Sequence, residues 1–130
     1  MTSDSQARNK GPGAVHVGMM RVDLHLPGVD SLKGKRALLN KAKAALVRDL
    51  GVSVSEVGYQ DLWQRGALGV AVAASSITGA DRVLDRVVAV IERDPRLVVT
   101  AAVGDVQVLE TDSTEFAPPS DDTEMEIDGW

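Results

Sequence analysis

Two apolar periods alternate along the middle of this chain, and the alternation limits what it can fold into. Every second residue is apolar from Met20 to Leu26, which predicts a strand with one buried face. Apolar residues then recur at helical spacing and predict one buried helix face: Leu38, Leu39, Ala42, Ala45, Leu46 and Leu50. The remaining pattern predicts a short strand at 52–57, a strand at 67–75, a helix that buries Val83, Leu84, Val87, Val88 and Ile91, and a last strand at 97–109.

Capping signals mark the ends of the two helices. Ser31 is expected to cap the first helix at its N-terminus. Gly51 stands where a left-handed C-cap is expected. Thr78 and Asp81 have the spacing of a capping box for the second helix, with Asp in place of the usual Glu.

The resulting order, β-α-β-β-α-β, predicts a ferredoxin-like sandwich of the α/β (α+β) class. Right-handed crossovers place both helices on one face of a four-stranded antiparallel sheet, with the first and third strands in the middle. If Leu68, Val70 and Val72 face the helices, the open face carries Trp63, Arg65, Ala67, Gly69, Ala71 and Ala73. Many RNA-binding sheets of this topology stack bases on central aromatics. The Gly and Ala residues here argue against that mode and predict a flat floor.

The ends of the chain differ from its body in composition. Residues 1–13 are rich in Gly, Ser, Asn and Lys, and residues 110–130 hold eight acids and no base. Both are predicted to be disordered, which leaves 14–109 as one folded domain. The net charge of −5 hides this split, because residues 1–109 carry eleven acids and fourteen bases. The acidic tail is either a solubiliser or a competitor that folds back on the basic helix.

Several chemistries are excluded by composition. The chain has no cysteine, so disulfides, thiolate nucleophiles and Cys-ligated zinc are absent. No apolar run approaches the roughly 18 residues of a membrane span, and the N-terminus lacks the apolar stretch of a signal peptide, so a cytoplasmic protein is expected. Without a P-loop, a G-x-G-x-x-G or a metal-ligand spacing, we predict no cofactor and no metal.

Asp23 and His25 share one face of the first strand with Arg21. A His–Asp pair can act as base and orienter, but no nucleophile is placed with it. A solvated, mutually hydrogen-bonded polar strip is the favoured interpretation. We therefore assign no catalytic residue and expect a non-enzymatic protein.

The first helix is strongly basic. Residues 31–50 hold six bases against one acid, Asp49, and five of the six lie off the buried stripe. Bases in a first helical turn oppose the helix dipole, which favours a functional reason for them. Phosphate backbone is the most economical anion to propose. The predicted RNA or anion contacts are Lys33, Lys35, Arg36, Lys41 and Lys43.

The turn between the second and third strands carries four interface candidates: Asp61, Trp63, Gln64 and Arg65. Tryptophan at a sheet end is either a partial core plug or an interface anchor, since Trp, Tyr and Arg dominate binding hot spots. The sequence leaves both interpretations open.

Three blocks carry a family resemblance: "MMRVDLHLPGVDSLKGKRALL", "VSVSEVGYQDLWQRGALGVAVAAS" and "DRVLDRVVAVIERDP". Over residues 15–109 the chain resembles the YlxP-like family of small bacterial proteins, domain of unknown function 503. The resemblance implies a ferredoxin-like fold and no established activity. Family members are often encoded near translation and ribosome-maturation genes, which implies a ribosome-associated role. If the shared blocks mark a site, its residues are Lys33, Lys35, Arg36, Asp61, Trp63, Gln64 and Arg65.

Two functional hypotheses follow. The first is a non-enzymatic RNA- or ribosome-associated factor in ribosome maturation or translation, without membrane attachment or DNA sequence specificity. The alternative is a small homodimeric interaction or ligand-sensing module, in which the open sheet face packs against a second copy.

Overall fold

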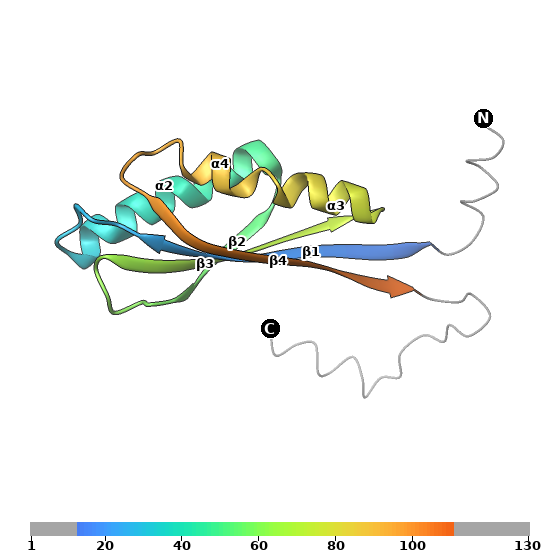
Figure 1. Ribbon diagram of the computed structural model, residues 1–130, viewed down its shortest axis with the longest axis horizontal. Coiled ribbons are helices and arrows are strands. Elements are labelled where there is room, and N and C mark those ends of the chain that lie inside the picture. Colours follow the sequence, from blue (N-terminus) through green and yellow to red (C-terminus); the bar gives the residue numbers. More distant parts are fainter. Residues whose placement is uncertain (1–12, 111–130) are drawn as a thin grey trace, which may run out of the picture. The chain divides into compact units, whose positions relative to one another are not determined.

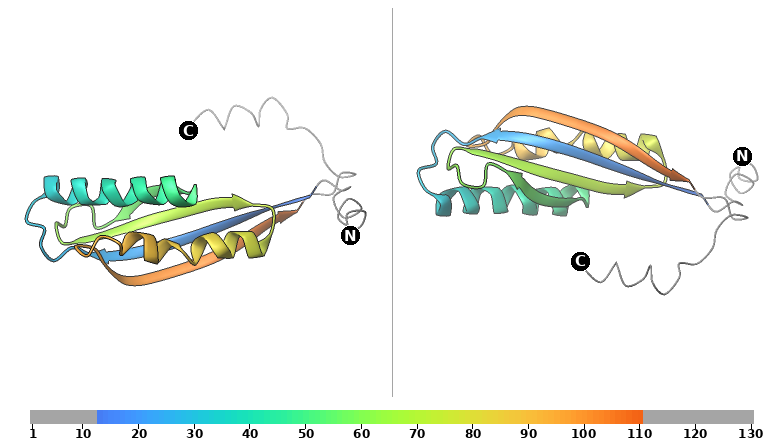
Figure 2. Two further views of the ribbon diagram at one scale, coloured as in Figure 1. Left: turned by 90° about the horizontal axis from the view of Figure 1, so that it is seen from above. Right: turned by 90° about the horizontal axis from the view of Figure 1, so that it is seen from below.

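The computed structural model describes residues 13–110, in which three helices cover one face of a four-stranded sheet (Figures 1 and 2). The elements are β1 (Ala14–His25), α2 (Leu32–Leu50), β2 (Ser53–Gly58), β3 (Arg65–Ala74), α3 (Ile77–Leu84), α4 (Val87–Ile91) and β4 (Val98–Glu110). The strand order is β2-β3-β1-β4. The predicted ferredoxin-like arrangement, with the first and third strands in the middle, is confirmed. The two end segments predicted to be disordered lie almost wholly outside the described residues.

The strand register sets the two faces of the sheet. Arg21 of β1 and Ser55 of β2 both stand opposite Gly69 of β3, so the small residues of β3 run along the open face. The other face meets the helices in one core that includes Val22, Leu24, Leu39, Leu46, Leu68, Val70, Val87 and Ile91. None of the helices in this part of the chain is long and apolar enough to cross a membrane.

Ala67 lies on the predicted open face, but its side chain is fully buried there. A Cβ built on Gly58 would stand 3.2 Å from the Arg21 guanidinium and 3.3 Å from the Ala67 Cβ. Arg21 therefore lies across the sheet at this point and covers Ala67. The open face is floored by small residues only beyond Arg21, towards Gly69 and Ala71.

Both predicted caps of α2 are confirmed. The Ser31 Oγ accepts a hydrogen bond from the Gly34 N–H at 3.0 Å. Gly51 has a φ of 65° and its N–H donates to the Val47 carbonyl at 3.0 Å, a left-handed conformation that glycine adopts without steric cost.

The second predicted helix is in fact two helices. The Arg86 N–H donates to the Val83 carbonyl at 3.1 Å, and such an i→i−3 bond tightens the turn between α3 and α4. The β-branched run that follows has a low helix propensity. Leu84 and Val87, on the two sides of the break, are both buried.

Two details of this segment correct the sequence prediction. Val90 is buried, whereas Val83 and Val88, expected in the core, are only half-buried. The cap of α3 is Ser76, whose Oγ accepts from the Gly79 N–H at 3.0 Å, and not Thr78. The helix starts at Ile77, so Thr78 already lies inside it.

Candidate nucleic-acid interface

Lys35 is not a surface cation, and its predicted contact with an anion is wrong. Only 2% of the residue is exposed. Its Nζ donates to the Tyr59 carbonyl at 2.5 Å and the Leu62 carbonyl at 2.7 Å, and it lies 3.3 Å from the Glu56 carboxylate. A lysine ammonium has three donors; two of them are hydrogen-bonded to main-chain carbonyls, and the charge is paired with Glu56.

The acceptors of Lys35 belong to the turn between β2 and β3. Tyr59 has a φ of 57°, and its carbonyl also accepts from the Leu62 N–H at 3.1 Å. The side-chain amide of Gln64 donates to the Val29 carbonyl at 3.2 Å. The main-chain carbonyl of Gln64 accepts from the Leu26 N–H at 2.9 Å. The turn is thus fixed both to α2 and to the connection that precedes α2.

Some of the predicted interface candidates are used to hold this turn in place, and others remain exposed at the surface. Gln64 holds the turn in place. Arg65 is exposed but packs on Tyr59, with its guanidinium carbon 4.1 Å from the centre of the Tyr59 ring and a nitrogen 3.0 Å from the Tyr59 hydroxyl. Asp61 is exposed and borders a shallow hollow of about 410 Å³ beside Trp63.

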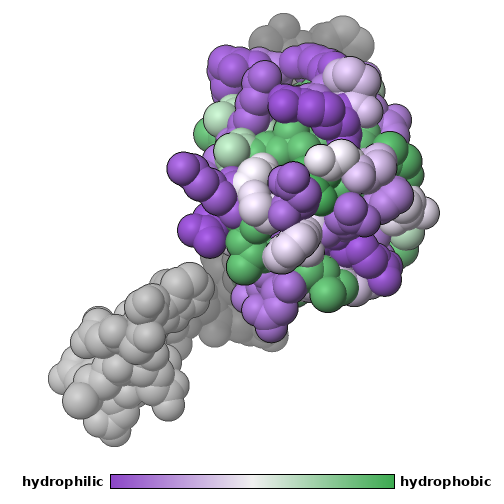
Figure 3. Space-filling model, turned by 90° about the vertical axis from the view of Figure 1, so that its left-hand side faces the viewer, coloured by the Kyte–Doolittle hydropathy of each residue, from purple (hydrophilic) through white to green (hydrophobic). Residues whose placement is uncertain are grey.

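Trp63 is 50% exposed and the neighbouring Leu62 is 48% exposed. This exposure favours the interface-anchor interpretation of the tryptophan over that of a partial core plug. The two side chains form an apolar tip on a rigid turn, which is the arrangement expected of an interface anchor. Figure 3 faces this end of the domain and shows apolar residues set among hydrophilic ones.

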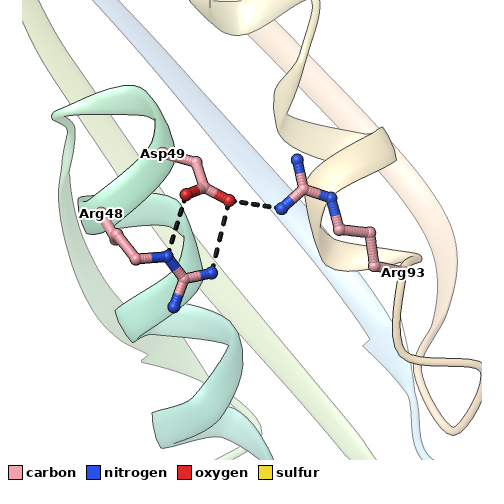
Figure 4. A network of polar contacts seen from close by, with 3 residues as sticks. All are labelled: Arg48, Asp49 and Arg93. Carbon is pink, nitrogen blue, oxygen red and sulfur yellow. Dashed lines mark hydrogen bonds and ion pairs between the residues drawn. The ribbon is translucent and has the colours of Figure 1, made fainter.

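A second cationic region lies between α2 and the end of α4. A groove of about 480 Å³ separates them, and four cations line it: Lys41, Arg48, Arg93 and Arg96. We call it the basic groove. Asp94 is its one acidic lining residue. Asp49, on the last turn of α2, accepts from Arg48 at 2.9 Å and from Arg93 across the gap (Figure 4).

The two carboxylates of this region remain ionised. Hydrogen bonds from Arg48 and then Arg93 lower the pKa of Asp49 to about 2. The Arg96 side chain and backbone N–H lower the pKa of Asp94 to about 2. Four cations therefore face two carboxylates at neutral pH, and the basic groove keeps an excess of positive charge.

The outward surface of α2 supplies three further predicted contacts: Lys33, Arg36 and Lys43. Lys33 and Arg36 are exposed and Lys43 is half-buried. Within residues 13–110, no carboxylate lies within 4.0 Å of any of the three. Arg36 and Lys43 are seven residues apart, so they lie on one side of the helix two turns apart.

Asp23 does not pair with His25 in this structure. Its carboxylate accepts from the Arg21 Nε at 2.9 Å, while His25 is exposed opposite Arg65 on β3. The polar strip is therefore built on an arginine–aspartate pair. Across residues 13–110, no group of three or more His, Asp or Glu side chains is placed to hold a metal ion.

Sequence reasoning missed Arg93 and Arg96. The signal was the stretch "RDPR" at 93–96, which directly precedes the last strand. In the predicted topology this connection lies beside the helix layer, so its two arginines could have been added to the cations of the first helix.

Comparison with known proteins places this fold and these blocks in one family. The family described as "Protein of unknown function (DUF503)" matches residues 17–103. A relative from Bacillus subtilis (strain 168), "Uncharacterized protein YlxP", is 36% identical over 81 residues, which cover 62% of this chain and 88% of the relative. The chain belongs to the YlxP-like DUF503 family, as its sequence blocks predicted.

Two solved structures are similar at low sequence identity. The de novo designed protein Foldit4 is 13% identical, with a TM-score of 0.42, covering 75% of this chain and 98% of that one. A C-terminal segment of the alpha subunit of aIF2 from Pyrococcus abyssi is 14% identical, with a TM-score of 0.36, covering 82% and 56% respectively.

Proposed function

We propose that this protein is a non-enzymatic, cytoplasmic RNA- or ribosome-associated factor that contacts phosphates in ribosome maturation or translation. The observation that carries the proposal is the basic groove, which four cations from α2 and from the connection after α4 line, and these cations outnumber their carboxylates two to one. The unpaired cations Lys33, Arg36 and Lys43 add positive charge to other sides of the same helix.

The local carboxylates favour recognition of a phosphate instead of opposing it. Asp49 bonds both Arg48 and Arg93, and it holds their guanidiniums near the groove before any ligand arrives. Preorganised guanidiniums lose less side-chain entropy on binding, and their planar forks match phosphate oxygens. Lys41 has no carboxylate within 4.0 Å in the described part of the chain and adds a free point charge.

The test compares two double variants of equal charge. Lys41→Gln with Arg96→Gln removes two groove cations, and Arg82→Gln with Arg86→Gln removes two exposed arginines outside the groove. Binding of the full chain to a labelled single-stranded ribosomal RNA fragment is measured by fluorescence anisotropy across a salt series. We expect the groove variant to bind about tenfold more weakly and to reduce the salt slope by about 0.7 for each lost phosphate contact.

The control double should bind within about twofold of the wild type, because it leaves the groove intact. Equal losses in the two doubles would show that only net charge matters and would reject the groove as the site. No binding by the wild type to RNA, together with no co-sedimentation with ribosomal subunits, would reject the function itself.

A further inference from the structure

The basic groove has an apolar floor as well as a cationic rim. Its four cations are exposed and form the rim. Between them the lining is apolar, and most of it is buried: Ala42, Val90, Ile91 and Leu97. An occupant that fits both layers carries negative charge on one side and apolar groups on the other.

The chain itself supplies a segment of this kind. Residues 111–130, which lie outside the described part of the chain and which we call the C-terminal segment, hold seven acids and no base. Within it, the stretch "EMEID" at 124–128 alternates acidic and apolar residues. In an extended conformation this alternation places Glu124, Glu126 and Asp128 on one side and Met125 and Ile127 on the other.

The connection to residues 124–128 is long enough for them to return to the groove. The strand β4 has 13 residues, starts just after Arg96 and ends at Glu110. Residues 111–123 are equal to β4 in number. Because each extended residue adds at most about 3.3–3.6 Å, the two stretches span the same distance. Residues 124–128 can therefore reach the beginning of β4, which Arg93 and Arg96 precede.

We propose that residues 124–128 dock in the basic groove of the same chain, with their acids at the cationic rim and Met125 and Ile127 on the apolar floor. The acids neutralise the positive charge that Asp49 and Asp94 leave in the groove. A tethered segment has an effective concentration on the order of 1 mM, so a weak contact is enough to occupy the groove. The segment then competes with phosphates for the same cations; this consequence rests on the proposed function, whereas the docking does not.

The first test detects docking without RNA. The chain has two tryptophans, Trp63 and Trp130, so Trp63→Phe leaves a single reporter close to the docked residues. At low salt we expect acrylamide to quench this full chain less than the same chain carrying Lys41→Gln with Arg96→Gln. The pair Arg82→Gln with Arg86→Gln, outside the groove, should leave quenching unchanged.

Salt supplies the second arm of this test. At about 1 M salt the Debye length is about 3 Å, so the difference in quenching should disappear. Equal quenching of all three chains at low salt would overturn the inference. Protection of the tryptophan that grows with protein concentration would assign the segment to the groove of a second copy and would also overturn it.

The second test measures competition with two triple variants of equal charge. The segment triple is Glu124→Gln, Glu126→Gln and Asp128→Asn. The control triple removes three exposed carboxylates outside the groove: Asp81→Asn, Asp85→Asn and Asp105→Asn. If the segment occupies the groove about nine-tenths of the time, the segment triple should bind the labelled RNA fragment about tenfold more tightly than the wild type.

The control triple should bind within about twofold of the wild type, because exposed charges away from a site contribute little. Equal tightening in the two triples would show a general effect of net charge and would overturn the inference. A chain whose tryptophan is protected by docking but which binds no RNA would reject the proposed function and leave the docking standing. RNA binding that the segment triple does not change would do the reverse.

Discussion

The helix α2 contributes to two cationic centres that differ in solvent access and in the number of acceptors around each cation. The Lys35 centre is closed, because two carbonyls accept hydrogen bonds from the buried ammonium and Glu56 pairs with its charge. The basic groove is open, and its cations outnumber their carboxylates. Lys35 and Lys41 are six residues apart and chemically identical. The number of local acceptors, and not the number of cations, decides whether a lysine is bound into the fold or stays exposed.

The largest effect should separate these two lysines. Lys35→Met leaves two carbonyls and a carboxylate without their donor, and we expect it to lower the free energy of unfolding by about 3 kcal/mol. Lys41→Met, the matched control, should change it by less than about 0.5 kcal/mol and weaken RNA binding. Urea unfolding and anisotropy measure the two quantities. Equal stability losses would show that the groove is structural as well.

Glu56→Gln tests the closed centre from its acidic side. The amide has the same shape as the carboxylate, but the Lys35 ammonium loses its opposite charge, so we expect a loss of about 1 kcal/mol. RNA binding should be unchanged because Glu56 lies outside the groove. Glu110→Gln, at an exposed position, is the control and should be neutral in the same urea titration.

Trp63→Ala tests the role of the tryptophan on the turn that the Lys35 centre holds in place. With half of the residue in water, we expect a stability loss of less than about 1 kcal/mol, compared with about 3–5 kcal/mol for a buried tryptophan. Thermal unfolding of the variant measures this difference. A loss in the upper range would return Trp63 to the role of a core plug and remove the apolar tip as an interface.

The smallest expected effect is on the stability of the fold at acidic pH. Because the folded-state pKa of Asp49 is lowered to about 2 by Arg48 and Arg93, its stabilising contribution is complete above about pH 4 and is lost as the pH falls towards 2. Asp49→Asn should therefore flatten the pH dependence of stability in that window and nowhere above it. Carboxyl NMR titration checks the pKa directly, and an Asp49 titration near 4 would contradict the bridging arrangement.

Much of the fold could be predicted because its signals are local. Period-two segments gave the strands, and Ser31 and Gly51 marked the ends of α2 through contacts within four residues. The break between α3 and α4 could not be read in the same way. The buried residues Ala80, Leu84, Val87 and Ile91 keep helical spacing across the break, so the apolar pattern is that of one continuous helix.

The candidate site was predicted less completely for the same reason. The acceptors of Lys35 lie 24 and 27 residues away along the chain, so its burial leaves no trace in helical spacing. Arg93 joins the groove through Asp49, 44 residues earlier. Exposure of Lys33, Arg36 and Lys41 was predicted correctly, since these residues lie off the apolar stripe.

The Tyr59–Leu62 turn is anchored by main-chain carbonyls, and those groups are the same in every amino acid. Residues 61–63 can therefore be exchanged without touching the lysine that holds them, provided that position 59 tolerates a positive φ. The rest of the domain therefore holds residues 61–63 through contacts that do not depend on their side chains. Foreign tripeptides grafted there should be displayed in a fixed conformation.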